Sequence, residues 1–227
     1  MPASPVPSNG TSFPPAEAEA ARYALLRRLA PSMRHHLVVN LQPIGMIYEV
    51  MDRRLRQPQP DLAHVQDSAG KINGFAKAAL ASCLDVVSWL APDDSVTVAV
   101  DAAVRECAAL LATSLGFRGY ALRNEVAPLQ GQVRRSGVRC LLTGTLLYAT
   151  DHAAAPADLE IRATAEQDAA LLTVQVRPTS GDRGMAAEAN YRKLAWSDLQ
   201  ALAAADGVQL ARQGDRIELR LPWVGPR

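Results

Sequence analysis

Apolar residues recur at helical spacing along the first third of the chain. Over residues 16–56 the intervals between them are three, four or seven residues, which is typical of one face of an α-helix. The stripe consists of Leu26, Met33, Leu37, Leu41, Ile44, Tyr48, Met51 and Leu55. Because Pro31 and Pro43 interrupt this segment, we expect one long helix that bends. A second stripe from Leu62 to Leu90 has the same spacing and predicts a second helix with the seam of a coiled coil or bundle.

The sequence Gln-Pro-Gln-Pro at residues 57–60 separates the two helices, and Asp61 stands where a helix N-cap is expected. The two segments therefore predict a helical hairpin. Two helices cannot bury both apolar stripes against each other alone, so we expect a second copy of the chain to complete a four-helix bundle as a homodimer. The sequence Ala-Pro-Asp-Asp at residues 91–94 marks the end of this domain.

After residue 94 the pattern changes to short, alternating elements. The expected elements are a strand at 95–100, a helix at 102–115, a strand at 119–126, a helix at 137–151, strands at 159–165 and 170–177, a loop at 181–189, a helix at 191–205, and a hairpin of strands at 208–212 and 216–222. This order predicts an α+β fold, an α/β sandwich with helices on one face of a mixed sheet. We therefore divide the chain into a flexible tail (1–15), a helical hairpin (16–92) and a sandwich (93–227).

Composition excludes several classes of protein. A net charge of +1 with 48% hydrophobic residues argues against a disordered chain and against a general nucleic-acid binder. The three cysteines, Cys83, Cys107 and Cys140, are too far apart for a zinc site or a disulfide framework, which favours a reducing compartment. No apolar run approaches the length of a membrane span and the N-terminus lacks signal-peptide features, so we expect a cytoplasmic protein without a membrane partner.

The candidate chemistry lies in residues 35–44, HHLVVNLQPI. His35 is two residues from both Met33 and Leu37, which places it about 200° from each, on the exposed side of the helix. An exposed imidazole on a rigid helix can act as a nucleophile or phosphoryl carrier, and the alternative is an ordinary solvated side chain. Pro43 favours the first interpretation, because a proline inside a helix costs about 3 kcal/mol.

The segment HHLVVNLQPI resembles the phosphoacceptor motif of two-component sensor histidine kinases, which commonly reads HELRNPLAPI. His35 matches the phosphorylated histidine, and the other positions in register are Leu37, Leu41, Pro43 and Ile44. The hairpin around the motif is similar to the dimerisation and histidine-phosphotransfer domain of that family. The resemblance thus implies a dimeric bundle that carries a phosphoacceptor at His35.

This segment departs from the family pattern at three positions. His36 replaces the acidic residue, Val38 replaces the basic residue, and Asn40 replaces a proline. The acidic residue is the general base of autophosphorylation in that family. The resemblance therefore implies that His35 accepts a phosphoryl group, with His36 and Asn40 in support, without implying kinase chemistry.

The second half of the chain resembles the family's ATP-binding domain in the order of its elements. The sequence LLTGTLLYATDHA is similar to a segment that reads LLNLLLNALDAA, but Gly144 and Tyr148 stand at the asparagine positions, of which the second would hold Mg²⁺. Pro178 stands where the adenine-binding aspartate belongs, and the glycine-rich lid is missing. The resemblance thus implies a degenerate kinase domain that binds no cofactor and no metal itself.

Together these features resemble bacterial histidine phosphotransferases built on a degenerate kinase scaffold. Such proteins relay a phosphoryl group between response-regulator receiver domains, one of which can belong to a hybrid sensor kinase, and the receiver supplies Mg²⁺. We expect the receiver to dock below His35 on Val38, Gln42 and Met46. Residues 16–56 contain seven Arg and four acidic residues, and this excess of positive charge favours an acidic partner.

Two other functions remain open at this point. The same dimer, as a pseudokinase-type regulator, would bind a response regulator or a kinase without being phosphorylated, and the three substitutions around His35 favour this alternative. An ATP-dependent kinase ranks last, because it requires nucleotide binding without the expected residues.

Overall fold

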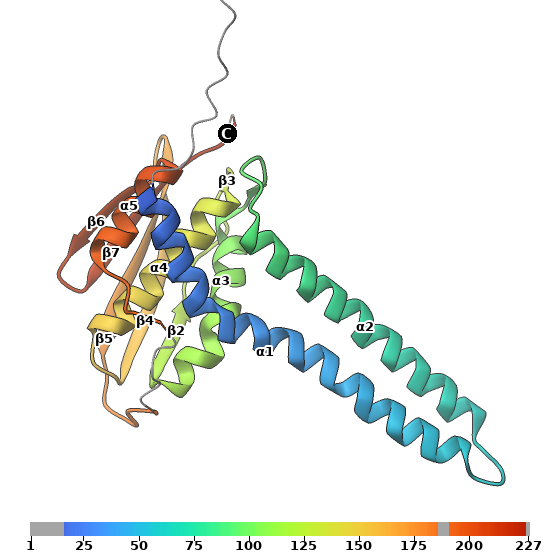
Figure 1. Ribbon diagram of the computed structural model, residues 1–227. Helices are drawn as coiled ribbons and strands as arrows, with labels where there is room; N and C mark the ends of the chain where they lie inside the picture. Colours follow the sequence, from blue (N-terminus) through green and yellow to red (C-terminus); the bar gives the residue numbers. More distant parts are fainter. Residues whose placement is uncertain (1–15, 186–190, 226–227) are drawn as a thin grey trace, which may run out of the picture.

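The computed structural model describes residues 16–185 and 191–225, which form a helical hairpin that projects from an α/β sandwich (Figure 1). Helix α1 spans Ala16–Leu55 and helix α2 spans Leu62–Leu90. Asp61 caps α2, because its Oδ1 accepts hydrogen bonds from the backbone N–H groups two and three residues further on, at 3.1 and 3.3 Å. The two predicted helices, the hairpin and the cap are thus confirmed.

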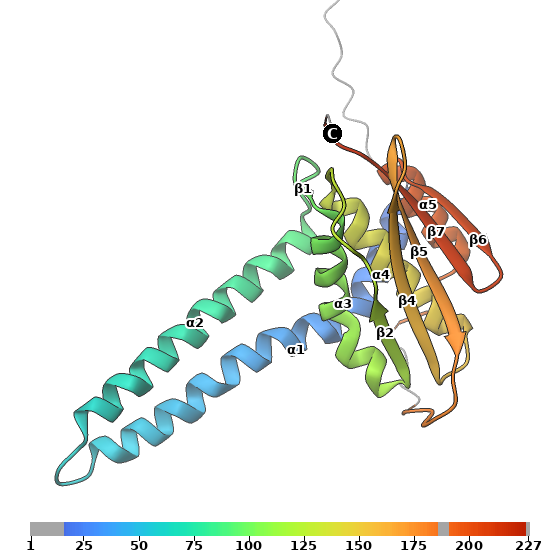
Figure 2. The same cartoon turned by 180° about the vertical axis from the view of Figure 1, so that it is seen from behind.

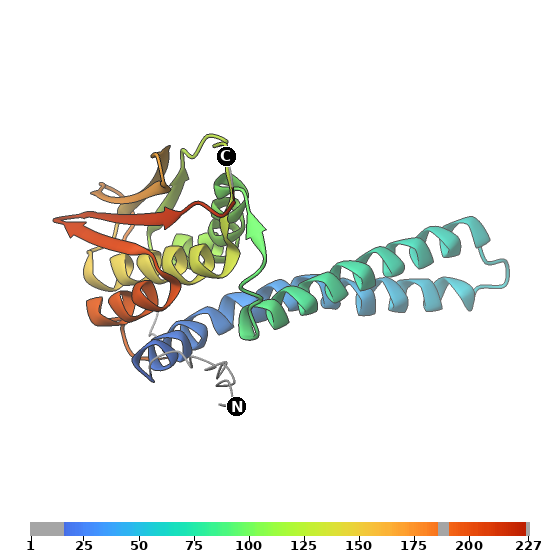
Figure 3. The same ribbon diagram turned by 90° about the horizontal axis from the view of Figure 1, so that it is seen from above.

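The sandwich contains a five-stranded sheet, the helices α3, α4 and α5, and a small two-stranded sheet. Its elements in chain order are β1 (Thr97–Val98), α3 (Val100–Phe117), β2 (Tyr120–Asn124), β3 (Val133–Arg134), α4 (Arg135–His152), β4 (Ala157–Ala165), β5 (Ala169–Pro178), α5 (Trp196–Asp206), β6 (Gln209–Gln213) and β7 (Arg216–Pro222). The strand order is β2-β4-β5-β7-β6, in which β2 and β4 are parallel and the other neighbours antiparallel. The three helices lie on one face of this sheet (Figures 2 and 3). The predicted α+β fold is confirmed.

Helix α4 lies at the centre of the core. All of its residues from Ser136 to Asp151 are buried, because the sheet covers one side and α3, α5 and the first half of α1 cover the others. Gly144 permits the close approach of α5, since a Cβ atom at this position would lie 2.9 Å from Cδ2 of Leu199. A helix that is buried on every side needs this extra layer, which α1 supplies.

The first half of α1 belongs to the core of the sandwich, whereas the second half belongs to the hairpin. The buried residues of α1 are Ala18, Ala21, Ala24, Leu25, Leu29, Ser32 and Met33. The helix bends where it leaves the sandwich (Figure 1), in the region of Pro31, which cannot donate the backbone hydrogen bond of a regular helix. The predicted bend therefore separates the two halves of α1.

A buried ion pair joins α1 to α4. The guanidinium of Arg28 donates hydrogen bonds to both carboxylate oxygens of Asp151, at 2.7 Å each, and the two side chains are 5% and 2% exposed. Oδ2 of Asp151 also accepts a hydrogen bond from the backbone N–H of Leu194 at 3.1 Å. A bidentate pair fixes direction as well as distance, so the Arg28–Asp151 pair sets the position of α1 on the sandwich.

The hairpin leaves part of its apolar surface exposed. On α1, Leu37, Ile44 and Met51 are half-buried, whereas the exposed members of the predicted stripe follow one another at seven-residue intervals: Leu41, Tyr48 and Leu55. On α2 the exposed apolar residues include Leu80, Leu84 and Val87, which share one face of the helix. Each helix thus presents an apolar stripe that its partner in the hairpin does not cover.

The expected strand over residues 95–100 is wrong in length. The structure has only β1 there, which pairs with β3, and Val100 is already the first residue of α3. An alternating sequence forms a long strand only beside a partner of matching length, and β3 itself has two residues. The expected flexible tail over residues 1–15 and part of the expected loop over residues 181–189 lie outside the described residues.

The expected helix over residues 191–205 is also too long, because α5 begins at Trp196. The carboxylate of Asp198 accepts hydrogen bonds from the backbone N–H of Ala195 at 2.7 Å and from the side chain of Arg192 at 2.6 Å. These bonds fix the first turn of α5 at this place. Capping by side chains is not visible in the spacing of apolar residues, from which the longer helix was expected.

We expect Asp151→Ala to lower the free energy of unfolding by about 3–5 kcal/mol, because the substitution leaves the buried guanidinium of Arg28 without its partner. Asp52→Ala is the control, since it removes an exposed ion pair between the last turn of α1 and Arg56, just after the helix, and should cost about 0–1 kcal/mol. Urea unfolding measures both values. Equal effects of the two substitutions would contradict the role of the buried pair in holding α1.

Candidate functional site

His35 lies on α1 just after the bend, and its side chain is exposed. Val38, Gln42 and Met46 are exposed as well, and steps of three and four residues place them on the same face of α1 as His35. The residues that the sequence predicts for partner binding therefore form one continuous surface with the imidazole. Their role in binding stays a prediction.

A pocket of about 210 Å³ opens beside His35, and we call it the His35 pocket. It is lined by Pro31, Ser32, His35 and His36 from α1 and by Leu110, Thr113, Ser114 and Phe117 from α3. Sequence analysis did not identify the α3 residues, because an ordinary amphipathic helix carries no local signal that its end lies beside a histidine. The surroundings of His35 thus come from the hairpin and from the sandwich.

His36 is half-buried, and the centroids of the two imidazole rings are 6.3 Å apart at an interplanar angle of 54°. Within residues 16–185 and 191–225, no carboxylate forms a hydrogen bond or an ion pair with either ring. In the phosphoacceptor motif that this segment resembles, the residue after the histidine is acidic. Here that position holds the second imidazole, His36. The supporting role that the resemblance implies for His36 stays a prediction.

Asn40 joins the two helices of the hairpin just below the histidines. Its Nδ2 donates hydrogen bonds to the carbonyl oxygen of His36 at 3.1 Å and to Oγ of Ser82 on α2 at 3.0 Å. Ser82 in turn donates to the carbonyl oxygen of Ala78 at 3.0 Å. Asn40 therefore joins α1 to α2, which a proline at this position would not do. Its supporting role at the site stays a prediction.

The two positions that hold asparagines in the resembling family serve packing in this chain. Gly144 lies against α5, as described above. The hydroxyl group of Tyr148 hydrogen-bonds with the guanidinium of Arg212, and its ring stacks on His152 with the centroids 4.2 Å apart. The centroid of the Trp196 ring lies 5.6 Å from that of the Tyr148 ring. A pocket of about 190 Å³ remains beside α4, and its lining includes Tyr148, His152 and Arg212.

This part of the sandwich does not fit a Mg²⁺–nucleotide complex. Mg²⁺ takes oxygen ligands in near-octahedral geometry, whereas Gly144 offers no side chain and Tyr148 is engaged by Arg212. Asp182 accepts a hydrogen bond from the backbone N–H of Gly184 at 3.0 Å within its own loop. No cluster of three His, Cys, Asp or Glu side chains gathers as a metal site in the described part of the chain. That this chain holds no cofactor or metal stays a prediction.

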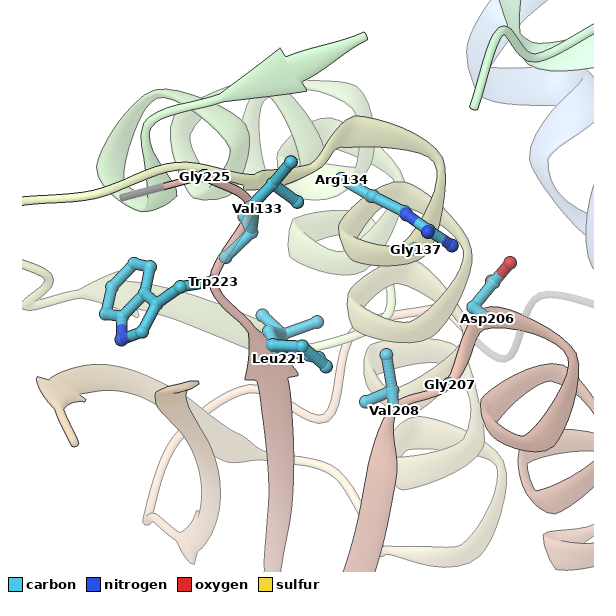
Figure 4. A pocket seen from close by; sticks show the side chains of 11 residues that line it. Val133, Arg134, Gly137, Asp206, Gly207, Val208, Leu221, Trp223 and Gly225 are labelled. Carbon is cyan, nitrogen blue, oxygen red and sulfur yellow. The ribbon is translucent and has the colours of Figure 1, made fainter. Parts of the chain in front are cut away.

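A further cavity of about 350 Å³ lies at the C-terminal end of the chain and contains none of the predicted site residues (Figure 4). Its walls include Val133, Val208, Leu221 and Trp223, and Asp206 lies at its edge. Burial raises the pKa of the Asp206 carboxyl group, although the guanidinium of Arg22, 3.7 Å away, acts in the opposite direction.

None of the helices in the described residues combines the length and the apolar character that a membrane span needs. No protein-family model matches the sequence. A comparison with curated proteins also finds no match.

Solved structures with a similar arrangement of elements include two histidine kinases and a phosphotransferase. A histidine kinase from Burkholderia phymatum STM815 is 15% identical over 92% of this chain and 99% of its own, with a TM-score of 0.42. The Acinetobacter baumannii histidine kinase AdeS is 11% identical over 81% of this chain and 98% of its own, with a TM-score of 0.42. A bacterial phosphotransferase is 14% identical over 92% of this chain and 98% of its own, with a TM-score of 0.39. At these values no residue role is transferred to this chain.

Proposed function

We propose that this chain is a histidine phosphotransfer protein, which relays a phosphoryl group between response-regulator receiver domains through His35. The observation that carries the proposal is the position of His35. Its imidazole is exposed at the pocket between α1 and α3, on a helix that the buried Arg28–Asp151 pair fixes to the sandwich. An exposed nucleophile on a rigid support is what transfer between two external partners requires.

The proposed reaction moves one phosphoryl group in each step. A neutral ring nitrogen of His35 attacks the phosphorus of an aspartyl phosphate in line, and the bond between phosphorus and the aspartate oxygen breaks. The phosphoryl group is then bound to the imidazole, and the aspartate is released as a carboxylate. In the transfer to a second receiver, an aspartate oxygen of that receiver forms a bond to phosphorus and the bond between phosphorus and the imidazole nitrogen breaks. The Mg²⁺ that stabilises the phosphate charge comes from the receiver domain, because Gly144 and Tyr148 offer no site for it.

The packing of α1 supports an external phosphoryl donor. A kinase domain that phosphorylates its own His35 must bring a nucleotide against this helix. In this chain the sandwich is held to the first half of α1 by the Arg28–Asp151 pair and by buried residues such as Leu25 and Leu29. A large movement of the sandwich toward His35 would break these contacts, and each buried polar contact is costly to break.

The alternative is a pseudokinase-type regulator that binds a response regulator or a kinase without being phosphorylated. The absence of a paired carboxylate at His35, among the residues that the structure describes, favours it, since nothing described orients the imidazole for nucleophilic attack. Both functions use the same exposed surface, and they differ only in whether a covalent phosphohistidine forms.

Transfer of label distinguishes the two functions. Purified receiver domains from the source organism are phosphorylated with radioactive acetyl phosphate and incubated with this chain in Mg²⁺. We expect acid-labile label on the wild type and on His36→Ala, and none on His35→Ala, because His35 is exposed whereas His36 is half-buried. Loss of label in His36→Ala alone would move the phosphoacceptor to that residue. Tight binding without any label would replace the proposal by the regulator.

We also propose that the active form is a homodimer in which the exposed stripes on α1 and α2 meet in a four-helix bundle. Leu80→Lys places a charge in the α2 stripe and is expected to shift the protein toward the monomer, because burying an unpaired charge is unfavourable. Lys71→Ala, elsewhere on the surface of α2, is the control. Size-exclusion chromatography with light scattering measures the mass, and a wild-type monomer would contradict this assembly.

A further inference from the structure

The walls of the His35 pocket come from α1 and α3, and the residues that line them differ in exposure. On the α3 side, Leu110 is buried, whereas Phe117 at the end of the helix is 65% exposed. Pro31 of α1 forms part of the opposite wall. The pocket is therefore mostly carbon-lined, with an imidazole at its edge. An exposed aromatic ring beside an apolar pocket is typical of an anchor in a protein interface.

The exposed charge next to His35 on α1 is a cation, Arg34. Residues 20–48 of α1 include Arg22, Arg27, Arg28 and Arg34 and contain no acidic residue. Arg34 is exposed beside His35 and has no ion-pair partner among residues 16–185 and 191–225. On α3, residues 107–117 contain no acidic residue either, and Arg118 follows directly. The exposed cation of Arg34 attracts a partner whose contacting surface is acidic, whereas Arg28 and Arg118 already face Asp151.

One carboxylate holds both walls of the pocket in place. Asp151 binds Arg28 of α1 at 2.7 Å and lies 3.8 Å from the guanidinium of Arg118 at the end of α3. Arg118 also donates hydrogen bonds to Oγ1 and to the carbonyl oxygen of Thr150, at 3.2 Å each. The distance between α1 and the end of α3 is thus fixed before any partner binds, which reduces the entropic cost of binding.

We propose that α3 forms the second half of the docking surface, and that Phe117 anchors one apolar side chain next to the phosphorylated aspartate of an acidic receiver domain. This inference rests on the proposed phosphotransfer through His35. The receiver is the occupant that the charges favour, since its active site gathers carboxylates and the exposed Arg34 lies next to His35. Continuity with His35 also favours it, because Phe117 and Pro31 line the same pocket as the imidazole.

The test is the rate of phosphoryl transfer from a phosphorylated receiver domain at increasing receiver concentration. We expect Phe117→Ala to raise KM about tenfold or more, as truncation of an interface anchor does, with kcat within about twofold. In this proposal Phe117 does not touch the phosphoryl group, so its loss weakens binding of the receiver equally in the ground state and in the transition state. Phe117→Leu should recover part of the affinity. Val96→Ala, an exposed apolar residue before the other end of α3, should behave as the wild type.

The other outcomes overturn the inference. If Phe117→Ala and Val96→Ala have the same KM, α3 does not bind the receiver. If Phe117→Ala lowers the molecular mass in light scattering, the pocket binds a second copy of this chain instead. If the wild type takes no label at all, the proposed phosphotransfer through His35 is wrong. Titration with the unphosphorylated receiver then tests the contact with α3 separately. Weaker binding of Phe117→Ala than of the wild type supports this contact, and equal binding rejects it.

Discussion

The carboxylate of Asp151 is the group on which the arrangement of this protein depends. It lies at the end of the buried helix α4 and binds Arg28 of α1, the backbone of Leu194 and, at longer range, Arg118 of α3. Three segments that are distant in the sequence are thereby fixed around one buried charge. Because a buried carboxylate is stable only when its hydrogen bonds are satisfied, the position of His35 relative to the sandwich follows from this network.

The use of α4 for packing has a consequence for function. In the resembling family the corresponding helix provides side chains for a nucleotide and its metal. Here Gly144 admits α5, Tyr148 binds Arg212, and Asp151 binds α1. The same helix that would serve catalysis thus stabilises a platform for the hairpin. Such a platform holds His35 in one fixed setting, which the proposed transfer between two partners would require.

Apolar spacing was a sound guide where a structure depends on nearby residues. The two long helices and the order of the larger elements followed from it, and the cap followed from Asp61 itself, because helix periodicity and capping act within a few residues. It was a poor guide where side chains or partner strands set a boundary. The strand expected at 95–100 lacked a long partner, and Asp198 shortened the helix expected at 191–205.

The sequence by itself determined that His35 lies on the exposed side of a bent helix, since the angle between residues on a helix is fixed by its geometry. It also identified Asn40 as a departure from the resembling motif, although not its bond to Ser82. Only the tertiary structure decided what surrounds the imidazole. The pairing of Arg28 with Asp151 spans 123 positions in the chain, and α3 reaches His35 only when the core is packed. Contacts between distant residues depend on the whole fold, and no local pattern specifies them.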